Sequence, residues 1–228
     1  MTTTLPMSNL QSCFNPNHQQ LSSYSPKQIS LHLQTFGCDG CDLGKQSLLN
    51  SPVVYRGNLL SKKMIIGEGP GKDEDEKGKP FVGPAGQLLD RIFAAAGWNT
   101  NTDWYLGNIL KCRPIAPPGS YKQNKTPTVK QRKACKPYIE REIDCIQPHI
   151  VVLLGKTAAE SLLDQVTNQP MYKIVGKTYR KERWPDTTFF VMYHPAAILH
   201  AKNDQNRYTE LRKATWQHVL YLKEIIHE

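Results

Sequence analysis

The apolar positions of this chain fall into four short runs separated by longer helical patterns. The short runs span Lys63–Ile66, Trp104–Ile109, Ile150–Leu154 and Thr188–Tyr193. They are largely apolar and too short for helices, which favours buried strands. Apolar residues recur at helical spacing in Ala85–Ala96, Thr126–Asp144, Lys156–Leu163 and Tyr208–Ile226. Strands that alternate with helices predict an α/β fold, with a mostly parallel sheet covered on both faces.

Local signals set the boundaries of these elements. Thr126 and Pro127 favour a cap and a first turn, so we expect a helix to start there and run towards Asp144. Pro137 lies inside that pattern and is expected to bend the helix. Residues 1–27 are polar and lack periodicity, so we expect a flexible tail, followed by one domain over residues 28–228.

Length and charge narrow the range of partners. The chain has 228 residues and a formal net charge of +9, which favours a polyanion such as DNA, although basic surfaces also serve solubility alone. No apolar run approaches the length of a membrane helix, and the N-terminus lacks the features of a signal peptide. We therefore expect a monomeric cytoplasmic protein whose six cysteines are thiols or metal ligands rather than disulfides.

A glycine-rich loop follows the first predicted strand. Gly67 and Gly69 allow a ligand to approach the backbone closely, and carboxylates and the ring of Phe81 follow before the next helix begins. Ligands of open α/β sheets bind at the carboxyl ends of the strands, where this loop lies. The segment therefore predicts a site for a flat polar molecule.

Four cysteines are candidate ligands. Cys38 and Cys41 have the spacing of a chelating pair, and Cys112 and Cys135 form a second, more distant pair. Four thiolates suit zinc or an iron–sulfur cluster, and the spacing leaves both open, together with unliganded thiols. Cys13 lies in the polar tail and is interpreted as incidental. We predict that Cys145, on an apolar stretch, is a packed core thiol.

Four ordered segments carry a resemblance to a known family. They are Cys38–Cys41, Gly67–Asp90, Asn108–Pro114 with Ala134–Pro137, and His194–Leu199. From about Cys38 onward the chain resembles the uracil-DNA glycosylase superfamily, in its iron–sulfur (family 4) branch. The resemblance implies a three-layer α/β/α sandwich around a four-stranded, mostly parallel sheet. It also implies a DNA repair enzyme that hydrolyses the N-glycosidic bond of uracil in DNA and leaves an abasic site.

Within this resemblance, a 4Fe–4S cluster is implied on Cys38, Cys41, Cys112 and Cys135. We expect its role to be structural. The segment Ala116–Lys125, between the last two cysteines, is longer than is usual in the family.

The resemblance also assigns roles at the strand ends. His194 ends the fourth strand, close to the end of the first, and is implied to donate a hydrogen bond to a uracil carbonyl oxygen. Asn108 offers both a donor and an acceptor to one edge of a pyrimidine, which discriminates uracil from cytosine. Phe81 offers a face for the flipped base. Glu68 is expected to position or activate the water.

Two positions differ from the better-known branch of the superfamily. Gly69 stands where that branch has an aspartate, and Gly71 stands where it has a tyrosine that excludes thymine. We assign the exclusion of thymine to Glu74, with a solvated loop carboxylate as the alternative.

The segment after His194 is expected to contact DNA. Ile198 stands where relatives insert an apolar wedge, with Leu199 as its neighbour; the alternative is a helix-start residue packed inward. Four basic residues are expected to contact phosphates, unless they are simply solvated: Lys111, Arg113, Lys202 and Arg207.

Three other functions compete with this interpretation. A dinucleotide loop would need a third glycine where the chain has Lys72. A non-enzymatic zinc or iron–sulfur nucleic-acid-binding module explains the charge and the cysteines but not the polar set at the strand ends. A superfamily relative captures the abasic sugar through a histidine before Lys-Thr-Pro, where this chain has Asn124, a poor nucleophile.

Overall fold

The computed structural model describes residues 21, 23–46, 52–115 and 124–227. At its centre is a six-stranded sheet in the order β1-β3-β2-β4-β6-β5. The strands are β1 (Tyr55–Gly57), β2 (Lys63–Gly67), β3 (Tyr105–Asn108), β4 (Ile150–Leu154), β5 (Thr178–Lys181) and β6 (Trp184–Met192).

The four strands predicted from the sequence are the inner four, and they pair in parallel. The outer two strands pair antiparallel, β1 with β3 and β5 with β6, so the prediction of a four-stranded sheet was wrong in number. The residues of β1 are only half-buried, and β5 alternates between exposed and half-buried positions. Such edge strands lack the apolar run that reveals a central strand. β6 also begins at Trp184, before the apolar segment from Thr188.

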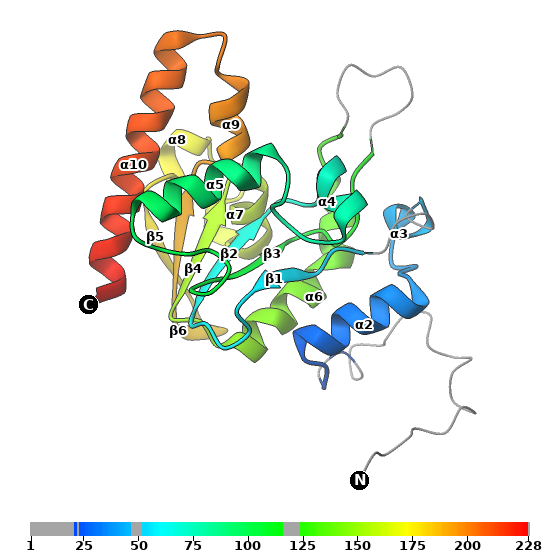
Figure 1. The fold of residues 1–228 in the computed structure, drawn as a ribbon. Coiled ribbons are helices and arrows are strands. Elements are labelled where there is room, and N and C mark those ends of the chain that lie inside the picture. Colours follow the sequence, from blue (N-terminus) through cyan, green and yellow to red (C-terminus); the bar gives the residue numbers. More distant parts are fainter. Residues whose placement is uncertain (1–20, 22, 47–51, 116–123, 228) are drawn as a thin grey trace, which may run out of the picture.

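Helices cover both faces of the sheet (Figure 1). The α-helices are α2 (Pro26–Phe36), α3 (Asp42–Gln46), α4 (Lys72–Lys77), α5 (Pro84–Ala95), α6 (Val129–Ile146), α7 (Lys156–Leu162), α8 (Met171–Ile174), α9 (Pro195–His200) and α10 (Gln205–His227), with a short 3-10 helix at Asp164–Val166. Alternate strand residues point to opposite faces, so Met64 and Ile66 pack into a core with residues of α6 and α7. Ile65 packs on the other face with residues of α5 and α10. The predicted three-layer α/β/α arrangement is confirmed.

Helix α6 starts later than predicted. Thr128, not Thr126, is its N-cap: the hydroxyl oxygen accepts from the Gln131 N–H, and the Gln131 side chain accepts from the Thr128 N–H. This reciprocal pair satisfies two amides that the helix itself leaves unbonded. The helix continues to Ile146, two residues beyond the expected end, and Pro137 lies within it.

Helix α2 was not predicted. Ser25 caps it with Gln28 in the same reciprocal manner, and Ile29 and Leu33 are buried beside Leu21. It begins within the expected tail, most of which lies outside the described residues, as do Cys13 and most of the Ala116–Lys125 segment. Among the described helices, none is long and apolar enough to cross a membrane.

Candidate active site

The carboxyl ends of three parallel strands bring the predicted site residues to one edge of the sheet. Gly67 ends β2 and pairs in register with Asn108, which ends β3. His194 follows β6 and caps α9. β6 is not the neighbour of β2, because β4 lies between them. At the end of β4, Gly155 has φ +85°, and a Cβ there would lie 3.2 Å from the His194 Cβ, so this glycine leaves room for His194.

Two of the predicted groups approach Gly67 closely, and a third stacks on one of them. A Cβ placed on it would lie 2.6 Å from the Asn108 Oδ1 and 2.7 Å from the Phe81 Cζ. The Phe81 ring in turn stacks on the His194 ring, with centroids 6.4 Å apart and planes 25° from parallel. Asn108 and Phe81 are almost completely buried, and His194 is half-buried. The structure therefore places a carboxamide and a phenyl ring against one backbone position that carries no side chain, and the imidazole stacks on that phenyl ring.

Phe81 is held in an unusual backbone conformation. Its φ of 58° lies in the left-handed region, which a bulky residue adopts only when its surroundings enforce it. Gly86 contributes, because a Cβ there would lie 2.0 Å from the Phe81 carbonyl oxygen. Strained residues of this kind concentrate at functional sites, which agrees with a ring presented to a ligand.

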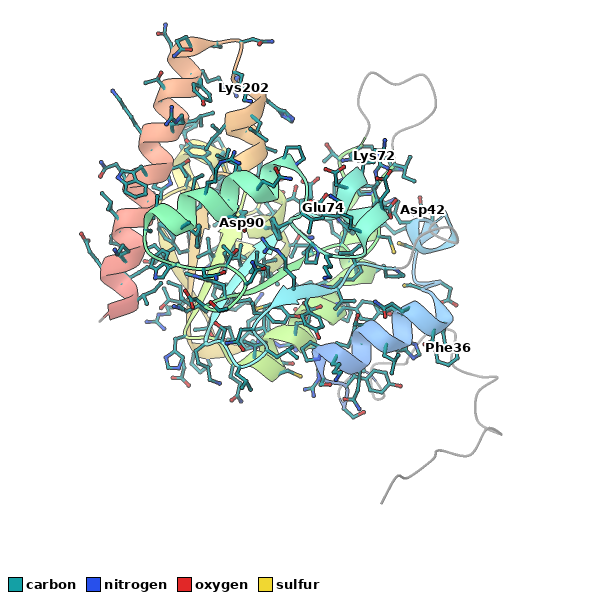
Figure 2. All side chains as sticks on the ribbon, in the orientation of Figure 1. Phe36, Asp42, Lys72, Glu74, Asp90 and Lys202 are labelled. Atoms are coloured by element: carbon teal, nitrogen blue, oxygen red, sulfur yellow. The ribbon has the colours of Figure 1, made fainter. Side chains whose placement is uncertain are left out.

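Glu74, labelled in Figure 2, ties together the two loops that form the site. Its Oε2 accepts from the Gly71 N–H at 3.0 Å, and its Oε1 accepts from the Gly83 N–H at 2.7 Å. The carboxylate thus links the loop after β2 to the loop that carries Phe81. It is not the freely solvated group of the alternative interpretation, and its exclusion of thymine stays a prediction.

His194 is neutral with a fixed tautomer. Burial lowers the pKa of its imidazole to about 4, with His200 as a smaller contribution in the same direction. Its Nδ1 accepts from the Ala196 N–H at 3.1 Å, so the proton of the neutral ring is assigned to Nε2. The ring therefore offers one N–H donor at the edge of the sheet without carrying a charge.

The four candidate cysteine ligands line one cavity. Cys38 and Cys41 come from the loop before α3, Cys112 follows β3, and Cys135 lies on α6. The other lining residues are Gly40, Leu43, Leu110 and Ala134. The Lys111 N–H donates to the Cys135 Sγ at 3.3 Å, and the Tyr138 hydroxyl lies 3.9 Å from the Cys38 Sγ.

Burial shifts the pKa values of the thiols in this cavity, and a side-chain contact joins the two helices beside it. Burial raises the pKa of the Cys135 thiol to about 12, and also raises that of Cys38. The Gln131 Nε2 donates to both carboxylate oxygens of Asp42, at 3.0 and 3.1 Å, which holds α3 against the first turn of α6. Within the described residues, no three Cys, His, Asp or Glu side chains are arranged to hold a single metal ion.

Two predicted DNA contacts are wrong. The side chain of Ile198 is 2 % exposed and packs against Ala201 and Leu211, so it is the inward-packed residue of the alternative and not an exposed wedge. Lys111 is 1 % exposed and forms an ion pair with Glu142, so it is not available to a phosphate.

The remaining predicted contacts lie nearer the surface. Leu199 is half-buried, and Arg113 is half-buried with its Nε donating to the Asn124 Oδ1 at 2.7 Å. Lys202 and Arg207 are exposed. Figure 2 shows Lys202 at the turn between α9 and α10 and Lys72 at the start of α4, both in the upper part of the view.

Cys145 is less buried than a core thiol. It is half-buried, and its Sγ donates to the Tyr24 carbonyl oxygen at 3.4 Å, close to the start of α2. It does not line the cavity of the other four cysteines.

Comparison with known proteins decides the family. A sequence model of the uracil DNA glycosylase superfamily matches residues 54–220, which include Gly67, Phe81, Asn108 and His194. The chain belongs to this superfamily. Several relatives bear the name type-4 uracil-DNA glycosylase, among them those of three organisms. That of Archaeoglobus fulgidus is 35 % identical over 77 % of this chain and 84 % of its own. The protein of Saccharolobus solfataricus is 35 % identical over 72 % of this chain and 73 % of its own. The protein of Thermotoga maritima is 31 % identical over 83 % of this chain and 89 % of its own.

The close approach at Gly67 yields a prediction for this superfamily member. Gly67→Ala would press a methyl group into the Asn108 carboxamide and the Phe81 ring, so we expect kcat/KM for the glycosylase reaction to fall about 10- to 100-fold. Gly97→Ala is the control, because a Cβ there would meet no atom within 4 Å, although Gly97, unlike Gly67, has a positive φ. We expect Gly97→Ala to lower stability by about 1 kcal/mol and leave kcat/KM unchanged. Equal losses of kcat/KM in the two variants would contradict the importance of the close contact of Asn108 and Phe81 with Gly67.

Proposed function

We propose that this protein is a uracil-DNA glycosylase that hydrolyses the bond between uracil and deoxyribose and leaves an abasic site for repair. The observation that carries the proposal is that Asn108 and Phe81 meet at Gly67, while the Phe81 ring stacks on the ring of His194. These groups supply a stacking face, an amide and a neutral donor at one edge of the sheet. The type-4 uracil-DNA glycosylase names of the relatives support the same activity.

Recognition begins when the target base leaves the DNA stack. Extrusion costs a few kcal/mol of stacking and pairing, and stacking of a base on an aromatic ring recovers about 1–3 kcal/mol. In our proposal Phe81 provides that ring. The Asn108 carboxamide presents a donor and an acceptor to one edge of uracil, a pattern that the amino group of cytosine reverses.

Cleavage leaves the departing base as an anion while positive charge develops on the sugar. A preorganised donor at the base oxygen is then an effective catalyst, because it stabilises charge that exists only in the transition state. His194 fits this role: its Nδ1 is occupied by the Ala196 N–H, so its Nε2–H remains to donate to the base. Its low pKa keeps the imidazole neutral, which preserves this tautomer at physiological pH.

We assign the positioning of the attacking water to Glu68, which is half-buried and directly follows Gly67. The next residue, Gly69, packs on Leu110; a Cβ there would lie 3.1 Å from the Leu110 Cβ. The space available to a longer side chain at this position is therefore limited. We propose that Glu68 orients the water at the sugar carbon, and that Glu74 shapes the pocket against thymine.

We propose that Cys38, Cys41, Cys112 and Cys135 bind a 4Fe–4S cluster. The four residues line one apolar cavity, although within the described residues no three of them are arranged to hold a metal ion. Four thiolates suit either zinc or an iron–sulfur cluster, and the resemblance to the family 4 branch favours the cluster. Bound there, the cluster would act structurally, by joining the segment before α3 to α6 and to the chain after β3.

DNA binding is assigned to the edge that holds the site. We propose that Leu199 takes the place of the wedge predicted for Ile198, and that Arg113, Lys202 and Arg207 approach the phosphates. We further propose that the protein acts as a monomer on cellular DNA.

The activity is tested by incubating the purified protein with duplexes that contain one uracil, paired with guanine or adenine, without added metal. We expect release of free uracil and an abasic site, with cytosine and thymine left intact. An intact uracil after prolonged incubation would refute the enzyme. A protein–DNA adduct that persists on a denaturing gel would instead support covalent capture of the sugar, which Asn124 does not favour.

The pH dependence follows from the low pKa of His194. Unfolded histidine titrates near 6.5 but folded His194 near 4, so the folded state binds fewer protons between these values. The contribution of His194 to stability is therefore complete above pH 6.5 and is lost as the pH falls towards 4. The cleavage rate should show no loss from imidazole protonation until the pH approaches about 4. Titration of the His194 ring by NMR checks this, and a midpoint near 6.5 would contradict it.

A further inference from the structure

Beneath the site, Lys111 and Glu142 form an ion pair that the proposed reaction does not use. The Lys111 Nζ lies 2.5 Å from the Glu142 Oε1, and the two side chains are 1 % and 0 % exposed. Taking both charges out of water is costly, and replacing such a pair with apolar residues is often neutral for stability. A contribution to stability is therefore a weak explanation for this ion pair, and its contacts indicate a different role.

Lys111 contacts both the base-recognition residue and a candidate cluster ligand. Its Nζ donates to the backbone carbonyl oxygen of Asn108 at 2.9 Å, and its backbone N–H donates to the Cys135 Sγ at 3.3 Å. The ammonium group thus lies under the peptide that carries the Asn108 carboxamide. One residue connects the end of β3 to the wall of the cysteine cavity.

Glu142 fixes the ammonium from the other side. It lies two turns after Cys135 on the buried face of α6, and its Oε2 accepts from the Tyr105 hydroxyl at 2.9 Å. Gly107 leaves room for the carboxylate, because a Cβ there would lie 2.9 Å from the Glu142 Oε2. The carboxylate therefore contacts β3 at Tyr105 and Lys111 just beyond the strand, and sets where the ammonium lies.

We propose that Lys111 and Glu142 are positioning residues that hold the Asn108 peptide, and through it the carboxamide, in the orientation that recognises uracil. The inference rests on the proposed function. The pair acts through Asn108 and does not touch the substrate. Because the same lysine also contacts Cys135, the pair fixes the position of the Asn108 peptide relative to α6, the helix that carries this thiol.

The test uses Lys111→Met/Glu142→Gln, which removes both charges together and retains a hydrogen-bond acceptor for Tyr105. Lys111→Met alone is less informative, because it leaves a buried carboxylate without its partner and threatens folding. We expect the double variant to keep the iron and sulfide content of the wild type. We expect its kcat/KM on uracil-containing DNA to fall about 10- to 100-fold, with a matching rise in the inhibition constant of free uracil.

A double-mutant cycle with Asn108→Ala separates positioning from general damage. If the pair acts through Asn108, removing it in the Asn108→Ala background should change kcat/KM by less than about twofold. The same fold loss in both backgrounds would overturn the inference, as would full activity of the charge-free variant or a loss that follows the loss of iron. Failure of the proposed function itself is distinguishable, because the wild-type protein would then release no uracil.

Discussion

Replacing His194 by alanine is expected to lower kcat/KM for uracil release by about 100- to 1,000-fold, the loss measured when a preorganised donor to a developing anion is removed. The ring lies against Phe81 at the end of β6, with Nδ1 bonded to the Ala196 N–H, so Nε2 is its free donor. Because the donor acts mainly in the transition state, we expect affinity for uracil-containing DNA to change little. Single-turnover cleavage and equilibrium binding on the same duplex measure the two effects separately.

His200→Ala is the matched control for this variant. His200 lies in the last turn of α9, is exposed, and is on the same short helix. We expect it to retain the wild-type cleavage rate. Parallel losses of cleavage and DNA binding in His194→Ala would indicate that His194 shapes the DNA-binding surface instead of stabilising the leaving base.

Replacing Cys135 by alanine is expected to abolish binding of the proposed iron–sulfur cluster and to destabilise the fold. Cys135 lies on α6, whereas Cys38 and Cys41 precede α3, so a cluster that joins them links distant parts of the chain. A loss of about 3 kcal/mol would lower the Tm by roughly 10 °C at this chain length. Iron and acid-labile sulfide analysis, together with thermal unfolding, measure both effects.

Cys145→Ala is the control for this experiment, since Cys145 is a half-buried thiol on the same helix but outside the cavity. It should keep the same iron content as the wild type. A Cys135→Ala protein with full iron content would refute the ligand assignment. Zinc alone at stoichiometric occupancy in the wild type would refute the cluster.

Sequence periodicity was sufficient for the central part of the fold. The inner strands each contain a short apolar run because helices cover both of their faces, and this run is the signal that the sequence carries. Tyr55–Gly57 and Thr178–Lys181 gave no such signal, since edge strands pair on one side and remain partly exposed. The start of α6 was available to sequence analysis, because Thr128 and Gln131 have the spacing of a reciprocal cap that Thr126 lacks.

Site residues could be predicted where they belong to a sequence motif. They could not be predicted where their role depends on packing between elements that are far apart in the sequence. Lys111 was interpreted as a surface cation because its partner, Glu142, comes from another element and local sequence does not reveal the pairing. Ile198 was interpreted as a wedge, but its burial depends on how α5, α9 and α10 pack together. The sequence predicted that Glu74 excludes thymine, with a solvated loop carboxylate as the alternative, and only the folded loops show that its carboxylate accepts from two backbone amides.

The most direct test of the shared pocket is a crystal structure of the protein with free uracil bound. We expect the pyrimidine to stack on the Phe81 ring, with the Asn108 carboxamide along one edge and the His194 Nε2 within hydrogen-bond distance of a carbonyl oxygen. Uracil bound elsewhere, or in contact with only one of these three residues, would contradict the account.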